Sequence, residues 1–170
     1  MKSKAYMEQN TITIRTGNPN DVGELLTLIK ELALYEKALN EVENTEERLL
    51  EDGFGANPLY GFFLAEYDGK VVGMALYYYR YSTWKGKSLY LEDLYVQQIY
   101  RKHKIGLHLF KALAQKAKDE NCHRISWQVL DWNEPAINFY KKLGAELDPE
   151  WVNGHLSKTG YLQLLNSPVL

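Results

Sequence analysis

The chain has 170 residues, 45% of them hydrophobic and 13% aromatic, which is typical of one folded domain and excludes a disordered chain. Its net charge of −2 argues against a protein whose whole surface binds nucleic acid. Its single cysteine, Cys122, excludes an internal disulfide framework. The first ten residues, MKSKAYMEQN, lack the apolar run of a secretory signal, and no segment approaches the length of a membrane span. We therefore expect a cytoplasmic protein with no membrane partner.

The first part of the chain is expected to form one strand and two helices. Residues 11–15, TITIR, alternate as a strand does. Residues 18–37 show apolar side chains at helical spacing, with Asn18 and Pro19 as start signals. A second helix is expected to begin at Asn44, with Glu47 as the fourth residue of a capping box, and to stop before the glycines of EDGFGANP.

The middle of the chain carries the strongest local signal, a β-hairpin. The runs YGFFLAEY and KVVGMALYYYRY are joined by Asp68-Gly69, which predicts a tight antiparallel turn. KSLYLEDLYV then continues the sheet. Its alternation predicts one face with Leu89, Leu91 and Asp93 and another with Tyr90, Glu92 and Leu94.

The rest of the chain is expected to alternate between helix and strand. A helix is predicted over residues 105–120, a strand over 124–130 (RISWQVL), a short helix opened by Asn133 and Pro135 and ended near Gly144, and a strand over 161–165 (YLQLL). The complete order is β-α-α-β-β-β-α-β-α-β. It predicts a mixed sheet with helices on its faces, in a single domain spanning residues 1–170.

The loop YRKHKIG, residues 100–106, lies between a predicted strand and a predicted helix. Such a loop can offer backbone N–H groups to a phosphate, although it is normally richer in glycine. Its Lys-His-Lys centre leaves three interpretations open: a phosphate-binding loop, a nucleic-acid patch or a charged turn. The basic run is short and the rest of the chain is balanced or acidic, so an RNA-binding module, which would show steep salt dependence, is the minor alternative.

Three stretches together resemble the GCN5-related N-acetyltransferase (GNAT) family: YLEDLYV, R-x-x-x-I-G opening a helix, and VLDWNEPAINFYKKLGA. Within it, IKELALYEK, LLEDGFG and WNEPAINFYKKLGA are similar to the diamine acetyltransferases of the spermidine/spermine and thialysine types. YSTWKGK looks more like the thialysine type, because the other type usually carries an acidic residue where Ser82 stands. The resemblance, which runs over about residues 11–145, implies an α/β (α+β) GNAT fold: a mixed, mostly antiparallel sheet flanked by helices and splayed at its central strands.

The resemblance implies acetyl transfer from acetyl-CoA to a primary amine of a small diamine, polyamine or lysine/thialysine-like substrate, by direct attack in a ternary complex. Aminolysis of a thioester must remove a proton from the amine and return one to the leaving thiolate. Glu92 is implied to take the amine proton, through a water, and Tyr140 to protonate the thiolate. The alternatives are an exposed strand carboxylate for Glu92 and a core tyrosine for Tyr140.

The resemblance also implies where the cofactor binds. Pantetheine is expected to pair with the splayed strand, and the phosphates are expected to lie at the loop and the helix start. Where the family loop reads Arg/Gln-x-x-Gly-x-Gly/Ala, Arg101 and Gly106 fit but Lys104 replaces the first glycine, which would permit positive φ. We expect weaker cofactor affinity, and the alternative function is a catalytically weak CoA-binding or regulatory protein. The implied cofactor residues are Leu94, Tyr95, Val96, Arg101, Lys102, His103, Lys104, Ile105, Gly106, Leu107, Asn133, Glu134, Pro135, Ala136 and Tyr140.

The acceptor amine is expected to meet carboxylates and aromatic rings, which suit a flexible cation. The candidates are Tyr35, Glu36, Ser82, Trp84, Glu92 and Asp93, and a solvated surface is the alternative for Glu36 and Asp93. The four histidines show no spacing of a metal site, so no metal is expected. The resemblance implies a homodimer, with the poorly matched C-terminal part at its interface.

Overall fold

The computed structural model describes residues 11–166. The ten N-terminal residues, on which the expectation about a secretory signal depends, lie outside the described residues, as do residues 167–170. The chain divides into two compact units, Met1–Gln128 and Val129–Leu170. Within residues 11–166, no helix is both long and apolar enough to cross a membrane.

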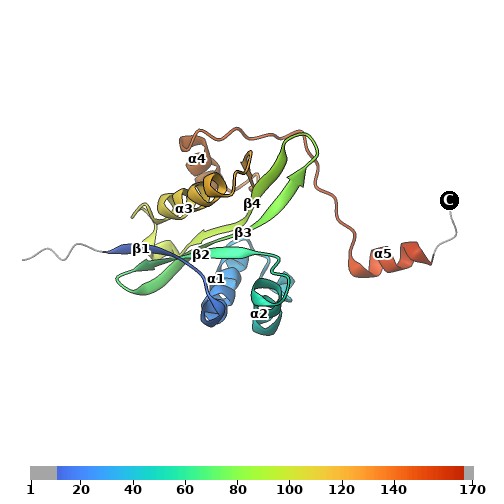
Figure 1. The fold of residues 1–170 in the computed structure, drawn as a ribbon, viewed down its shortest axis with the longest axis horizontal. Helices are drawn as coiled ribbons and strands as arrows, with labels where there is room; N and C mark the ends of the chain where they lie inside the picture. The colour runs from blue at the N-terminus through green and yellow to red at the C-terminus, as the bar shows by residue number, and fades with distance from the viewer. Residues whose placement is uncertain (1–10, 167–170) are drawn as a thin grey trace, which may run out of the picture. The chain divides into compact units, whose positions relative to one another are not determined.

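The first unit is built on a five-stranded sheet in which the strands follow one another in chain order (Figure 1). The first four strands pair antiparallel and the last pairs parallel. They are β1 (Ile12–Thr16), β2 (Gly61–Tyr67), β3 (Lys70–Ser82), β4 (Gly86–Val96) and β5 (Ile125–Ser126). The predicted mixed, mostly antiparallel sheet is therefore confirmed.

Three helices cover the two faces of this sheet, α1 (Val22–Tyr35) and α2 (Glu46–Phe54) on one and α3 (Ile105–Asp119) on the other (Figure 1). Each face has its own core. The α1-side core includes Leu25, Leu28, Leu49, Phe62, Leu64, Met74, Leu76 and Tyr95. The α3-side core includes Ala75, Tyr77, Leu89, Leu91, Ile105, Leu109 and Leu113. Short 3₁₀ turns, η1 (Pro19–Asp21), η2 (Leu39–Glu41) and η3 (Gln98–Tyr100), complete the connections.

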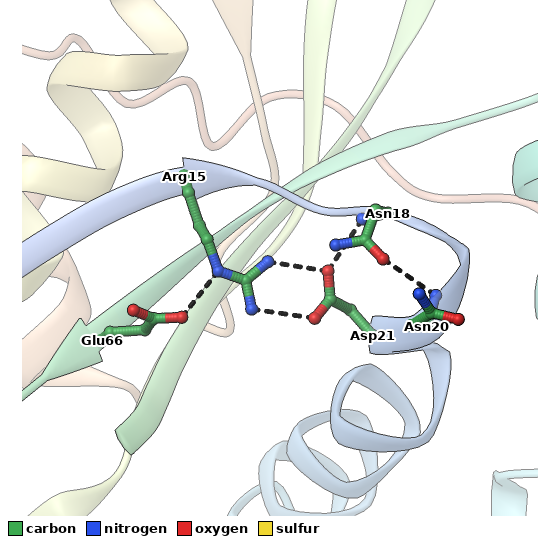
Figure 2. A network of polar contacts seen from close by, with 5 residues as sticks. All are labelled: Arg15, Asn18, Asn20, Asp21 and Glu66. Carbon is green, nitrogen blue, oxygen red and sulfur yellow. Dashed lines mark hydrogen bonds and ion pairs between the residues drawn. The ribbon is translucent and has the colours of Figure 1, made fainter. Parts of the chain in front are cut away.

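The entry into α1 is fixed by the polar network in Figure 2. The guanidinium of Arg15 on β1 contacts both oxygens of Asp21 at 2.7 and 2.8 Å and Oε1 of Glu66 on β2 at 2.6 Å. Asp21 also accepts from the backbone N–H of Asn18 at 2.8 Å, and Asn18 in turn accepts from the N–H of Asn20 at 2.9 Å. The hydrogen bonds from Arg15 lower the pKa of Asp21. This network joins two strands to the helix start.

The predicted hairpin is confirmed, and its turn explains why the signal is strong. Asp68 and Gly69 both have positive φ, 50° and 78°. Two left-handed residues match the right-handed twist of the flanking strands. The pairing of Tyr67 with Lys70 closes the turn.

The start of the second helix was predicted one residue too early. Thr45, not Asn44, is the N-cap of α2: its backbone is extended and its side chain accepts from the N–H of Arg48 at 3.3 Å. The side chain of Asn44 instead accepts from the N–H of Thr45 at 3.0 Å, so it is used before the helix begins. Arg48 therefore occupies the position expected for Glu47.

Two predicted strands differ from the structure. Of residues 124–130, only Ile125–Ser126 form a strand, which pairs with Leu89 and Tyr90 of β4 and leaves β4 beyond them with an open edge. Residues 161–165 are not a strand but part of helix α5 (Lys158–Leu165), capped by Ser157, whose hydroxyl accepts from the N–H of Gly160 at 3.1 Å. The described part of this second unit contains no strand to pair with, and leucine and glutamine are good helix formers.

Candidate acetyl-transfer site

Strand β4 contains a one-residue bulge at Glu92. In the pairing with β3, Asp93 lies opposite Leu76 while Leu91 lies opposite Tyr77, so Glu92 has no partner and its side chain is exposed. An extra residue of this kind re-aims the side chains around it. Glu92 is thus presented at a break in the sheet, which is the setting expected for a residue that meets substrate.

The bulge makes the predicted alternation of β4 wrong. Leu89 and Leu91 belong to the α3-side core, as expected from a common face. Strict alternation would put Asp93 and Tyr95 there too, but Tyr95 belongs to the α1-side core. Asp93, two residues before Tyr95, therefore shares the face of α1, because the extra residue at 92 shifts the alternation by one.

Beyond the bulge, β4 has an open edge, which is the side of residues 91–96 that faces away from β3. The parallel pairing with β5 involves only Leu89 and Tyr90, and no described strand pairs with this edge further along. The N–H of Gln97 donates to the carbonyl of Val72 on β3 at 2.9 Å. In a trans peptide the preceding carbonyl, that of Val96, points the opposite way, toward the open edge. This geometry fits an added strand-like ligand such as pantetheine.

Three carboxylates near the bulge, those of Asp93, Glu92 and Glu36, influence one another electrostatically. Burial, followed by the charges of Glu92 and Glu36, raises the pKa of the half-buried Asp93 to about 7. Glu36 comes from a distant part of the chain, the C-terminal end of α1, and burial raises its pKa as well. None of the interactions that shift the pKa of Asp93 comes from a cation. A cationic ligand would relieve this repulsion, so the cluster favours an ammonium group.

An aromatic pair stands next to Glu92. The rings of Tyr78 and Tyr90 lie 5.1 Å apart across β3 and β4, and Arg80 lies 5.6 Å from the centroid of the Tyr90 ring. Burial and then Tyr78 and Glu92 raise the pKa of Tyr90. Sequence reasoning missed this pair. The tyrosine run YYYRY was visible, but only the register of the two strands shows which of its members faces Glu92.

The structure does not bring Ser82 and Trp84 to the carboxylates. Both belong to the end of the β3–β4 hairpin, where Ser82 accepts from the N–H of Lys85 at 3.2 Å and Trp84 is 87% exposed. Ser82 is six residues along β3 from Leu76, the partner of Asp93, which corresponds to roughly 20 Å. Within the first unit, the carboxylates and the two hairpin residues are therefore separate groups.

The basic loop adopts the backbone conformation that the missing glycine would have taken. Lys102 and Lys104 have positive φ, 73° and 62°, and Lys104 is the N-cap of α3. The following residue, Ile105, is 1% exposed and anchors the helix start in the α3-side core. His103 packs its ring 5.1 Å from that of Tyr67. The N-terminal N–H groups of α3 can thus face an anion despite the substitution.

The remaining candidates, residues 133–136 and Tyr140, belong to the second unit and are described within it. Asn133 is the N-cap of α4 (Glu134–Lys142), as predicted, and its Oδ1 accepts from the N–H of Ala136 at 3.3 Å. Tyr140 is 7% exposed and lies 5.3 Å from the ring of Phe139. Gly144, with φ of 82°, follows the helix as expected. Residues 11–166 contain no group of three His, Cys, Asp or Glu side chains that could hold a metal ion.

Comparison with known proteins identifies the family. Residues 26–145 match the Acetyltransferase (GNAT) family. The chain belongs to this family. Among curated GNAT relatives, it is 45% identical over 143 residues to the thialysine N-ε-acetyltransferase of Bos taurus, which covers 79% of this chain and 84% of the relative. It is 40% identical over 129 residues to the enzyme of the same name from Caenorhabditis elegans, covering 75% of this chain and 78% of the relative.

One further curated relative and two solved structures are also similar to this chain. The spermidine/spermine N(1)-acetyltransferase-like protein 1 of Homo sapiens is 44% identical over 139 residues, which are 78% of this chain and 20% of that protein. An integron cassette protein of V. cholerae superposes with a TM-score of 0.75 at 27% identity, covering 92% of this chain and 98% of that one. The aminoglycoside N-acetyltransferase AAC(6')-Iy, solved in complex with CoA, gives a TM-score of 0.71 at 19% identity, covering 89% and 98%.

These findings confirm the resemblance, the GNAT fold and the assignment as an N-acetyltransferase. The protein is an enzyme of acetyl transfer to amines, and the alternative of a catalytically weak CoA-binding protein is not favoured.

Proposed function

We propose that this enzyme transfers the acetyl group of acetyl-CoA to a primary amine of a small, lysine- or thialysine-like diamine. The cluster of Asp93, Glu36 and Glu92 carries this proposal, because it can hold an ammonium group beside the open edge of β4. A diamine would keep one nitrogen charged for binding while the other reacts. The relatives named thialysine N-ε-acetyltransferase support a lysine-like acceptor.

We assign the proton transfers to two residues. Glu92, exposed at the bulge, accepts the proton of the attacking amine through a water molecule. The amine nitrogen forms a bond to the thioester carbon, and the carbon–sulfur bond breaks in direct attack within a ternary complex. Tyr140, neutral at physiological pH, donates its proton to the departing thiolate. This leaves Glu92 protonated and Tyr140 ionised; Glu92 releases its proton to solvent and Tyr140 takes one up, so the balance closes without an acyl-enzyme intermediate.

Acetyl-CoA would be held by backbone groups and by the basic loop. The open edge of β4 offers groups of Leu94, Tyr95 and Val96 to pantetheine; the carbonyl of Val96 already accepts from Nε of Arg101, so it would use its second lone pair. Residues 101–107 and the N-terminus of α3 suit the phosphates, supported by the left-handed backbone at Lys104. Asn133 and the first turn of α4, residues 134–136, are proposed to contact the pantetheine arm as well.

We further propose one domain over residues 1–170, a homodimer that uses the C-terminal part, and a cytoplasmic location. The family match to residues 26–145 supports the single domain, because it spans both compact units. Light scattering of the full chain tests the dimer. A monomeric mass at catalytic concentrations would contradict it.

A panel of acceptors tests the proposed activity. Thiol release from acetyl-CoA is measured with thialysine, lysine, putrescine and spermidine, and acetyl-CoA binding is measured by isothermal titration. We expect turnover to be fastest with thialysine or lysine and slow with spermidine. Binding of acetyl-CoA without turnover of any amine would contradict the proposal.

A further inference from the structure

The side chain of Arg101 contacts two other segments of the protein. Its Nε donates to the carbonyl of Val96 at 3.1 Å. Its guanidinium lies 4.8 Å from the centroid of the Tyr35 ring and 5.9 Å from that of Tyr95. Attraction between a guanidinium and aromatic faces holds such an arrangement together. Arg101 thus connects three segments: the cofactor loop, the end of β4 and the last turn of α1.

Other contacts join the same end of α1 to the same end of β4. Nε2 of Gln97 donates to both oxygens of Glu31, at 3.0 and 3.1 Å. After burial, the charge of Glu31 is the largest contributor to the raised pKa of Tyr95. Glu31 and Tyr35 are four residues apart and therefore lie on one side of the helix. This side of α1 is packed against the strand end that leads into the cofactor loop.

The next residue after Tyr35 is Glu36, whose charge reaches Asp93. A short path therefore runs from the proposed phosphate loop through Arg101 and Tyr35 to the proposed amine site. Every contact on it lies within the first unit.

On the basis of the proposed function, we propose that Arg101 is a positioning residue that couples cofactor binding to amine binding. A loop that is fixed by acetyl-CoA fixes Arg101, and the guanidinium then fixes Tyr35 and the adjacent Glu36. Coupling between two binding sites is reciprocal, so a change at Tyr35 must also be felt by the cofactor. An arginine that only bound phosphate would not affect the amine.

Steady-state kinetics separate these roles. In Arg101→Gln, we expect KM for thialysine at saturating acetyl-CoA to rise at least about fivefold, the lower range of typical coupling. Arg101→Lys keeps a cation but not the planar group that reaches Val96 and Tyr35 together, so we expect an intermediate KM. Lys70→Gln is the matched control, since it removes a cation 5.7 Å from the neighbouring ring of Tyr100. It should leave both KM values unchanged. A rise in KM for acetyl-CoA alone in Arg101→Gln would overturn the proposal.

A binding experiment without amine gives an independent test. Isothermal titration of acetyl-CoA into Tyr35→Ala, Arg101→Gln and the double variant forms a double-mutant cycle, with circular dichroism as the check of folding. We expect each single variant to weaken binding and the double variant to be no weaker than the poorer single one. An unchanged dissociation constant in Tyr35→Ala would overturn the coupling. Because this cycle needs no turnover, it tests the link from Tyr35 through Arg101 to the cofactor even if the proposed acceptor is wrong.

Discussion

Glu36, at the end of α1, lies close enough to Asp93 on β4 for its charge to raise the pKa of Asp93, after burial and Glu92 have acted in the same direction. The two residues are 57 positions apart in the chain, and the fold brings them within electrostatic reach of each other. With a pKa of about 7, Asp93 holds its proton in part at neutral pH. A bound ammonium group would favour loss of the proton of Asp93, so the site becomes more negative when its cationic ligand binds.

Amine affinity should therefore follow the ionisation of Asp93. We expect KM for thialysine to fall as pH rises from about 6 to 8, because the carboxylate that pairs with the ammonium forms through this range. In Asp93→Asn, KM should be higher and independent of pH over the same range. A wild-type KM that stays flat from pH 6 to 8 would contradict this assignment.

The same group should make the folded state less stable at high pH. The pKa of Asp93 is raised on folding, so the folded state binds the proton more tightly, and stability falls as pH rises from about 4 to about 7. Asp93→Asn should thus raise the melting temperature at pH 8. Asp21→Asn is the matched control with the opposite sign, because Arg15 lowers the pKa of Asp21 and the pair stabilises the fold above pH 4.

Replacing the proton acceptor should slow chemistry at neutral pH. We expect Glu92→Gln to lower kcat on the order of 100-fold at pH 7, a typical share for general base catalysis. The deficit should shrink toward pH 10, where more of the amine is already neutral. The pH profile of thiol release measures both effects. Glu51→Gln, on the exposed side of α2, is the control, and an equal rate for Glu92→Gln at pH 7 would exclude the role.

Removing the proton donor should affect the leaving group and not the cofactor. Tyr140→Phe keeps the buried ring and loses only the hydroxyl, so we expect thiol release to slow by roughly 10- to 100-fold. The dissociation constant of acetyl-CoA from isothermal titration should remain near that of the wild type. Tyr161→Phe, on the exposed surface of α5, provides the control in the same unit. If Tyr140→Phe turns over at the wild-type rate, another group protonates the thiolate.

Restoring glycine in the loop should tighten the phosphate site. Lys104 already has φ of 62°, a conformation that costs a lysine about 1 kcal/mol, so Lys104→Gly should raise the melting temperature. Without a Cβ the backbone can approach the pyrophosphate more closely, and we expect acetyl-CoA to bind up to about fivefold more tightly. Asn121→Gly, at a left-handed position beyond α3, should leave acetyl-CoA affinity unchanged. A clear loss of affinity in Lys104→Gly would show that the ammonium contributes more than the backbone freedom.

Local signals in the sequence predicted those parts of the fold that local chemistry determines. Asp68-Gly69 predicts its turn because two left-handed residues suffice, and Asn133 predicts a cap because its side chain reaches the next turn. The bulge at Glu92 gives no such signal. It exists only in the register between β3 and β4, which depends on packing over the whole sheet. Residues 161–165 show the same limit, since an apolar run becomes a strand only where a partner strand is available.

For the candidate site, too, the sequence named individual residues but not the contacts between distant parts of the chain. Family resemblance named Glu92, Asp93, Tyr35 and Glu36, and in the structure the charges of Glu92 and Glu36 both act on Asp93. The contacts of Arg101 with Tyr35 and of Gln97 with Glu31 were not predicted, because the partners are about 66 residues apart in the chain. No spacing rule for a helix or strand relates such positions.

The extra residue in β4 changes which residues of the strand face α3. Before it these are the odd-numbered Leu89 and Leu91, and after it the even-numbered Leu94 and Val96. Any side chain at position 92 leaves both cores intact, because the position belongs to neither. Keeping the residue but pairing it in regular register would instead turn Asp93 and Tyr95 toward α3, and Leu94 and Val96 toward α1. The side chain at position 92 can therefore change at small cost to folding, whereas straightening the bulge with the residue retained would disturb two hydrophobic cores at once.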